Sequence, residues 1–274
     1  MPSLKITSLN AGRLLQERTR KYLERLASRD GMPDILCLQD IPVRDLSILT
    51  ETYPHIAFAP MTNHLINGVR AVVGISIVSR YFMTNIVHHT VWGDGKLKDL
   101  QGVNNKNERF PPTKETDDLI DTTEDRVAIC VTVIKDGRKY NIATTHGYWV
   151  RGGVSNDRQR QSTRKLLAFL HKEAMQRDGL LFVADMNPDR DGEVYRTMVS
   201  DIGMDNLHSL MPKSVKTTLD PEHPASKKGI KVVADWICEW PRHDRMFFLS
   251  DVRLHSGVSD HCALSATVEI DYGL

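Results

Sequence analysis

Short apolar runs rich in β-branched residues recur along the chain and predict β-strands. Valine, isoleucine and threonine favour extended backbone because their branched side chains pack well on a pleated surface. The runs lie at residues 4–9, 34–39, 71–79, 126–134, 140–145, 180–184, 232–238 and 262–270. The pattern therefore predicts a protein built around β-sheets.

Two longer segments, residues 12–29 and 158–177, have the periodicity of amphipathic helices. Each places apolar side chains on one stripe and charged side chains on the opposite face, which is typical of a helix that covers a sheet. The stripes contain Leu15, Tyr22, Leu23 and Leu26 in the first segment, and Leu166, Leu167, Phe169 and Leu170 in the second. Strands outnumber helices and alternate with them irregularly, which favours two packed sheets flanked by helices over a barrel of regular βα repeats.

The segment at residues 93–125 has little periodicity, and it carries five Lys and Arg against nine Asp and Glu. We expect a long polar surface excursion here, and its acidity makes it a poor binder of phosphate. A linker between two domains is the alternative interpretation. The strands on either side read as parts of one core, so we expect a single domain over residues 1–274.

The composition is that of a soluble globular protein. The 274 residues are 41% hydrophobic and 26% charged, with a formal net charge of +1. These values exclude a disordered or collagen-like chain. The balanced charge argues against a general electrostatic attraction to nucleic acid or to anionic membranes, so any site for a polyanion must be local.

No apolar run approaches the roughly 20 residues that a membrane helix needs. The N-terminal MPSLKITSLN lacks the charged and apolar regions of a secretory signal, so we expect a cytoplasmic protein without a membrane span. The four cysteines are far apart, and none forms a CxxC pair, which favours reduced core residues over a zinc or redox site. They are Cys37, Cys130, Cys238 and Cys262.

Polar side chains occur at or beside six of the predicted strands, where a core strand has no need of them. Ligands gather at strand ends in sheet-built enzymes, so these side chains could converge on one pocket. They are Asn10, Asp40, His146, Asp185 with Asn187, Asp235, and the Ser259-Asp260-His261 triplet. Each Asp or Asn alone is more often a helix cap or a turn residue, but six together favour a site. Carboxylate and amide oxygens suit Mg²⁺ or Mn²⁺.

The same segments carry a resemblance to a known family. In chain order they read SLN, CLQD, TTHG, ADMN, VADWI and SDH. This series resembles the endonuclease/exonuclease/phosphatase superfamily, the DNase I-like metal-dependent phosphoesterases, and residues 145–170 are similar to a set of its bacterial members. The resemblance implies an α/β fold, a four-layer α/β/β/α sandwich of two mainly antiparallel mixed sheets.

The resemblance also implies a metal site at Asn10, Asp40 and Asp260. Asp40 stands where the family usually has glutamate in an LQE motif, so its side chain is one methylene shorter. Aspartate still offers two oxygens to a cation. Because its side chain is shorter, the ion must move, a water must bridge the gap, or the backbone must come closer. We therefore expect weaker metal binding.

The catalytic residues implied by the resemblance are His146, Asp185, Asn187, Asp235 and His261. Asp235 would pair with His261, fix its tautomer and raise its pKa. An extended backbone would place Asp185 and Asn187 on one face, where they could hold a water and a phosphate oxygen. Either His261 or Asp185 would accept the proton of the attacking water.

His146, Asn187 and Arg126 would bind the substrate phosphate. For Arg126, which opens a predicted strand, a solvated strand start is an equally good interpretation. The basic residues of 158–177 and Lys227, Lys228 and Lys231 could form a phosphate-binding rim, although a solvated face is the commoner reason for such charge. His88 and His89 are adjacent in a strand-like run, point to opposite faces and cannot share an ion.

The leading hypothesis is a Mg²⁺-dependent (or Mn²⁺-dependent) phosphodiesterase that attacks phosphorus with water. Its partner would be a phosphate ester, with nucleic acid as one candidate, which would make the protein a nuclease. The abasic-site repair subgroup is disfavoured because Ile41 and Pro42 follow Asp40 in place of Thr-Lys. The alternatives are a phosphomonoesterase, a lipid- or sugar-headgroup phosphohydrolase, and an inactive binding module.

Overall fold

The structure is a computed structural model that describes residues 3–14, 16–28, 32–104, 113–150, 153–177, 179–188, 192–199, 206–240 and 246–271. Its described strands form two sheets of six. The first sheet has the order β11 (Met246–His255), β12 (Ala263–Asp271), β1 (Ser3–Asn10), β2 (Ile35–Pro42), β4 (Val69–Ser79), β3 (His55–Ile66). The second has the order β5 (Met83–Trp92), β6 (Arg126–Lys135), β7 (Arg138–Thr145), β8 (Leu180–Asp185), β10 (Asp235–Trp240), β9 (His208–Ser209).

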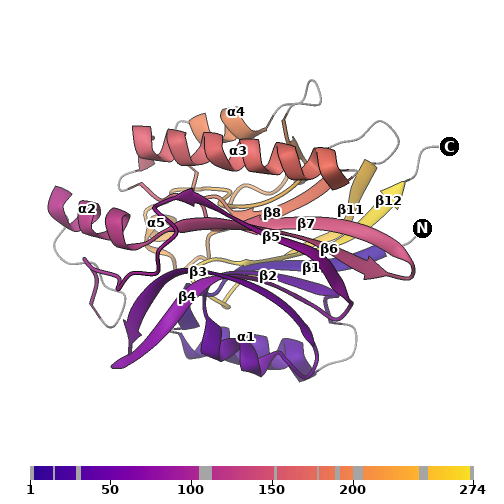
Figure 1. The fold of residues 1–274 in the computed structure, drawn as a ribbon, viewed down its shortest axis with the longest axis horizontal. Coiled ribbons are helices and arrows are strands. Elements are labelled where there is room, and N and C mark those ends of the chain that lie inside the picture. The colour runs from indigo at the N-terminus through magenta and orange to yellow at the C-terminus, as the bar shows by residue number, and fades with distance from the viewer. Residues whose placement is uncertain are drawn as a thin grey trace.

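Both sheets are mixed and mainly antiparallel. The pairs β1 with β2 and β7 with β8 are parallel, and the other named pairs are antiparallel. The described helices are α1 (Glu17–Ser28), α2 (Lys114–Thr123), α3 (Asp157–Arg177), α4 (Glu193–Met198) and α5 (Pro224–Lys227), with 3₁₀ turns at Gly12–Leu14 and Val43–Ile48. Helices α3 and α4 cover the outer face of the second sheet, and α1 covers part of the first (Figure 1). The predicted α/β/β/α sandwich is confirmed.

The central strands are apolar on both faces because both faces are buried. In β2, Ile35 and Cys37 point into the core between the sheets, whereas Leu36 and Leu38 pack under α1 with Leu23. This explains why the strands read as continuous apolar runs and not as an alternation. The apolar stripe predicted for the long helix is also confirmed, since Leu166, Phe169 and Leu170 are buried against the second sheet.

The strands that the apolar runs did not predict are β3, β5, β9 and β11, which form the outer edges of the two sheets. An edge strand has one neighbour and exposes more of its side chains, so its sequence is more polar. The strand β5, for example, has only exposed and half-buried positions between Met83 and Val91. His88 and His89 do lie in this strand.

The segment at residues 93–125 contains a helix that its weak periodicity did not reveal. Helix α2 begins after Thr113, whose hydroxyl accepts a hydrogen bond from the backbone N–H of Thr116 at 3.2 Å. The chain then returns to the core, where Glu124 and Asp125 are buried. The segment is therefore not confined to the surface.

The four cysteines are buried and unbridged, as predicted. None of the helices in the described part of the chain has the length and apolarity that crossing a lipid bilayer requires.

Candidate active site

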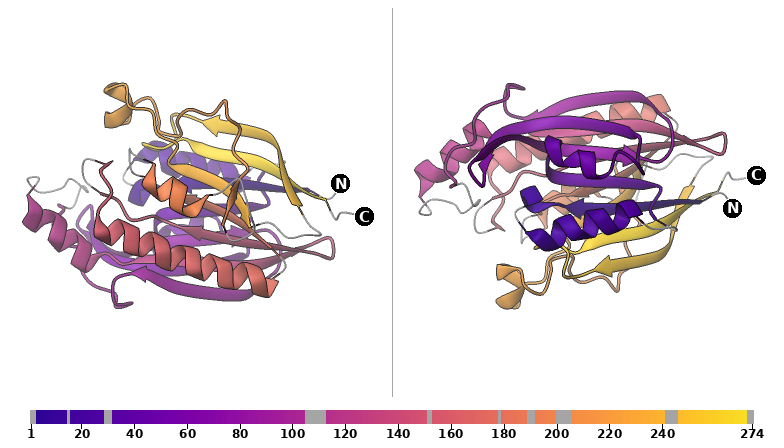
Figure 2. Two further views of the ribbon diagram at one scale, coloured as in Figure 1. Left: turned by 90° about the horizontal axis from the view of Figure 1, so that it is seen from above. Right: turned by 90° about the horizontal axis from the view of Figure 1, so that it is seen from below.

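The ends of seven strands meet at one edge of the sandwich. β1, β2, β7 and β8 end there, and their antiparallel neighbours β6, β10 and β12 begin there. Helices α2 and α5 lie at this end of the molecule, and the chain termini lie at the other (Figure 2). The topology therefore brings together residues that are far apart in sequence.

A cavity of about 170 Å³ opens between these strand ends. Seven of the nine predicted site residues line it: Asn10, Asp40, Arg126, His146, Asn187, Asp260 and His261. The other two, Asp185 and Asp235, have no exposed surface and lie beneath its wall. All nine predicted site residues therefore lie close together.

Asp185 is the centre of the hydrogen-bond network below the cavity. Its Oδ2 accepts from Nδ2 of Asn10 at 2.8 Å, and its Oδ1 accepts from the backbone N–H of Asn187 at 3.0 Å. The same Oδ2 lies 3.6 Å from a ring nitrogen of His146 and of His261. Burial opposes the charge of Asp185, but the two imidazoles and the donors hold its pKa below the usual value.

His261 is paired with Asp235 as the sequence predicts. Its Nδ1 lies 3.1 Å from Oδ2 of Asp235. Burial opposes protonation of the ring, but Asp185, Asp235 and the more distant Asp260 raise the pKa of His261 to about 10. Burial raises the pKa of Asp235 itself. The imidazole is therefore a cation at neutral pH, and Nδ1 faces the carboxylates.

Asn187 does not lie in extended backbone, so the predicted geometry of the Asp185–Asn187 pair is wrong. The strand β8 ends at Asp185, and Asn187 adopts a left-handed conformation with φ 45°. Its Nδ2 donates to the carbonyl of Gly147 at 3.1 Å. As a result Asn187 lines the cavity, while Asp185 stays buried behind it.

Asp40 lies on a β-bulge, where the pairing of β2 with β4 shifts between Leu38 and Ile41. Its carboxylate accepts from Nε of Arg13 at 3.1 and 3.2 Å. Burial opposes its ionisation, but Arg13, with His146 and Arg126, holds the pKa of Asp40 below the usual value. Both Asp40 (φ 55°) and Arg13 (φ 59°) have left-handed backbone, a strain that non-glycine residues tolerate mainly where the surroundings enforce it.

A series of ion pairs and hydrogen bonds runs along the cavity wall from Asp40 to His146. Arg13 also donates to Oε1 of Glu124 at 2.6 Å, and Oε2 of Glu124 accepts from Arg126 at 2.9 Å. Arg126 is buried, so the interpretation of this residue as a solvated strand start is wrong. Because arginine can only donate, its 3.4 Å contact with Nδ1 of His146 leaves the ring proton on Nε2. Burial and Arg126 lower the pKa of His146.

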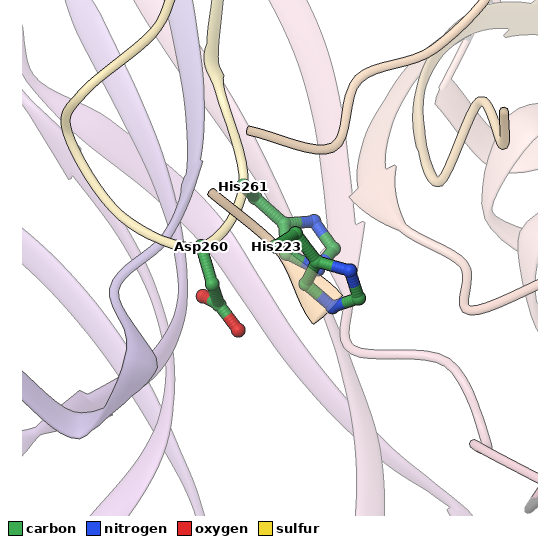
Figure 3. A group of neighbouring side chains, drawn as sticks. All are labelled: His223, Asp260 and His261. Carbon is green, nitrogen blue, oxygen red and sulfur yellow. The ribbon is translucent and has the colours of Figure 1, made fainter. Parts of the chain in front are cut away.

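His223 reaches the cavity from the residue before α5 and was not predicted. One ligand atom each of His223, Asp260 and His261 lie within 4.8 Å of one another, and Figure 3 shows the three side chains side by side. Asp260 is half-buried, and its Oδ1 accepts from the hydroxyl of Ser259 at 2.9 Å.

The sequence contained weak signals for two of the unpredicted residues. Arg13 lies three positions after Asn10, and Glu124 lies two positions before Arg126. Nothing in the local pattern around His223 or Trp149, which also lines the cavity, distinguishes them from ordinary loop residues.

The donor set and the local charge are suited to a divalent cation. The amide oxygen of Asn10 and the carboxylates of Asp40 and Asp260 line one cavity and provide hard oxygen donors. Glu124 lines the same cavity, and Asp185 and Asp235 lie beneath its wall, so carboxyl groups are concentrated around these donors.

Three of the six Lys and Arg residues of α3 have ion pairs with neighbouring carboxylates, among them Arg177 with Glu173. Arg158 pairs with Asp118 and Asp121, and Arg160 pairs with Asp157 and Glu193. These pairs favour the solvated, internally balanced face over a phosphate-binding rim.

No protein-family model matches the chain, and no curated protein matches its sequence. Solved structures do match it. They include an endonuclease/exonuclease/phosphatase from Bacteroides vulgatus, at 11% identity over 99% of this chain and 100% of that one, with a TM-score of 0.65. TDP2 from D. rerio, complexed with a single-strand DNA product, matches at 16% identity over 98% and 100%, with a TM-score of 0.63. Sphingomyelinase C from Streptomyces griseocarneus matches at 12% identity over 97% and 99%, with a TM-score of 0.58.

These similarities extend over nearly the whole chain at low identity. They show that the chain shares the fold of these proteins, the two-sheet sandwich that the resemblance of its motifs implies.

Proposed function

We propose that this protein is a metal-dependent phosphoesterase that hydrolyses a phosphodiester bond by in-line attack of water, with Mg²⁺ or Mn²⁺ as cofactor. The observation that carries the proposal is the cavity at the strand ends, which is lined by carboxylate and amide side chains, two guanidiniums and three imidazoles. Phosphoryl transfer requires this combination of charge stabilisation and positioning. DNA and lipid headgroups are both candidate substrates, because TDP2 and the sphingomyelinase share the fold.

Asn10, Asp40 and Asp260 would hold the metal ion through their oxygens. When bound, the ion supplies positive charge next to the phosphate, where negative charge develops in the transition state. The Asp40 carboxylate is already paired with Arg13, and its side chain is shorter than glutamate. Both features support the expectation of weak metal binding.

The remaining polar side chains would bind the phosphate and handle protons. Arg126 provides guanidinium donors for the phosphoryl oxygens. His146 lines the cavity beside it and would contact the phosphate, while its Nε2 lies 3.6 Å from Oδ2 of Asp185. His261 is a cation whose Nε2 is not used by Asp235, so it would donate a proton to the leaving oxygen of the ester. The proton lost by the attacking water would then restore the imidazolium of His261. Asp185 has no exposed surface, so it acts as a positioning residue through Asn10, Asn187 and the two histidines and does not bind the water.

Turnover of bis-p-nitrophenyl phosphate and of p-nitrophenyl phosphate, each with Mg²⁺, Mn²⁺ or EDTA, tests the proposal. We expect metal-dependent turnover with a preference for the diester. A preference for the monoester would favour a phosphomonoesterase, and inertness towards both would favour a binding module.

The variant His261→Ala tests the assignment of the site. Removing a group that transfers a proton typically costs 10²- to 10⁴-fold in rate, so we expect a loss of at least about a hundredfold. The matched control is His255→Ala, because His255 contacts Ser265 on the outer part of the first sheet and does not line the cavity. Equal rates in the two variants would rule out the proposed site.

A further inference from the structure

A second cavity adjoins the candidate active site. Its volume is about 300 Å³, at the lower end of the range for small-molecule sites. Four residues line both cavities: Trp149, Asn187, His223 and His261. The two cavities are therefore immediate neighbours.

The two cavities differ in chemistry. The first is walled by charged and polar side chains, whereas the second has apolar side chains over much of its wall. The apolar side chains of this wall include Leu219, Pro224, Ala225, Ile230 and Val232. An apolar wall favours an uncharged organic group, because moving apolar surface out of water stabilises the complex.

The wall of the second cavity is tied to the strand that carries Asp235. The backbone N–H of Thr218 donates to the carbonyl of Val232 at 3.0 Å. Its hydroxyl accepts from the backbone N–H groups of Ala234 and Asp235 at 2.9 and 3.0 Å. Thr218 is fully buried. The apolar wall is thus part of the same framework as the Asp235–His261 pair.

His223 lies at the boundary of the two cavities with a defined proton position. Its Nδ1 accepts a hydrogen bond from the backbone N–H of Ala225 at 3.0 Å, so the ring is neutral and its proton is on Nε2. A metal ligand needs a free lone pair, and this tautomer has none left at Nε2. The ring lies 6.0 Å from that of His261, at an interplanar angle of 87°. Figure 3 shows the two rings beside Asp260.

We propose that the second cavity binds an apolar, compact organic group esterified to the substrate phosphate, and that Nε2–H of His223 donates to an oxygen of that phosphate where the two cavities meet. The inference rests on the proposed function and specifies its substrate class. It favours esters with a ring over esters with a small group.

The test compares phenylphosphonate with methylphosphonate, which share the phosphonate group, resist hydrolysis and differ in the organic group. Binding is measured by calorimetry on the full chain with saturating Mg²⁺, so the readout does not depend on turnover. We expect phenylphosphonate to bind at least about tenfold more tightly, because its ring leaves water for the apolar wall. Equal affinities would overturn the inference while leaving the phosphate site intact. Binding of neither compound would contradict the proposed function as well.

The variant Ala225→Leu would place a larger side chain in the second cavity while keeping the backbone N–H that His223 accepts from. We expect this variant to bind methylphosphonate as the unmodified protein does and to lose most of the preference for phenylphosphonate. Lys227→Leu is the matched control, since Lys227 lies in the same short helix but does not line the cavity. A preference that survives in Ala225→Leu would overturn the location of the ring.

Discussion

Arg13 holds together the buried charges on one side of the cavity. Its guanidinium contacts the carboxylates of Asp40 and Glu124, and its side chain is only 6% exposed. A buried charge that loses its partner is costly, since neither water nor another group compensates it. Arg13 is therefore a structural requirement of the site even if it never contacts a substrate.

We expect Arg13→Ala to destabilise the protein by about 3–5 kcal/mol, the usual cost of removing one partner of a buried ion pair. The measurement is urea unfolding at pH 7. Arg20→Ala is the matched control, because the Arg20 side chain is 42% exposed and its pair with Asp45 should contribute at most about 1 kcal/mol. If both variants lose the same small amount, the Arg13 network is not a determinant of stability.

Among single residues, the sequence identified the candidate site residues that lie next to the end of a predicted strand. Asn10, Asp40, His146 and His261 each lie beside an apolar run, and the sheet topology brings those ends together. His223 could not be found in this way, because it follows no predicted strand and reaches the site only through the fold of its loop.

At the level of elements, the close approach of the ends of β7 and β8 sets the distance between His146 and Asp185. The backbone N–H of Gly147 donates to the carbonyl of Asp185 at 2.7 Å. A Cβ atom at Gly147 would lie 2.3 Å from the carbonyl oxygen of Met186. Glycine is therefore needed for the two strand ends to meet.

We expect Gly147→Ala to push the ends of β7 and β8 apart and to cost about 1–3 kcal/mol of stability, as overpacking usually does. Displacement of the site residues by about 1 Å can reduce turnover about a hundredfold. Thermal unfolding and diester hydrolysis measure the two effects. Gly68→Ala is the control, since this turn glycine has positive φ but no heavy atom within 4 Å of an added Cβ. Turnover that is equally affected in both variants would contradict the account.

Glu239 links β10 of the second sheet to β11 of the first. Its Oε2 accepts from the backbone N–H of Phe247 at 2.8 Å. Burial raises the pKa of Glu239, although this hydrogen bond opposes the shift. A carboxyl whose pKa is higher in the folded state supports stability below its unfolded pKa of about 4.3, and that support is lost as the pH rises through the folded value.

We expect Glu239→Gln to be more stable than the unmodified protein at pH 7, because glutamine can accept the same hydrogen bond and has no charge to bury. The difference should be about 1.4 kcal/mol for each unit by which burial raises the pKa, and it should shrink as the pH falls towards 4. Denaturant unfolding at several pH values measures it. A difference that does not change with pH would show that the charge of Glu239 is not the cause.

For the whole molecule, the sequence predicted the central strands, the long helix α3 and the sandwich. These elements are buried, so apolar composition and periodicity determine them. The sequence placed the first helix over residues 12–29, whereas α1 covers Glu17–Ser28 after a 3₁₀ turn at Gly12–Leu14, and Leu15 lies outside the described residues. The apolar runs did not identify the edge strands β3, β5, β9 and β11, because many of their side chains are partly solvated. Within β5, only His88 and His89 were expected in a strand. Helix α2 was missed because few of its side chains are buried.

The sequence pattern did not predict the two cavities, because local patterns do not determine the loops that form their walls. Their walls come from loops whose paths depend on long-range hydrogen bonds, such as those of Thr218 to β10. The pattern of strand ends located the site, but not the charge network of Arg13 or the apolar cavity beside it.

The central claim is that the polar strand ends form one site for a divalent ion and a phosphate. Its most direct test is a crystal structure grown with Mn²⁺ and inorganic phosphate, with the ion located by anomalous scattering. The account predicts one strong peak in the cavity, in contact with oxygens of Asn10, Asp40 or Asp260, and a phosphate beside Arg126 and His261. A well-ordered cavity that contains neither, with Mn²⁺ bound elsewhere, would contradict it.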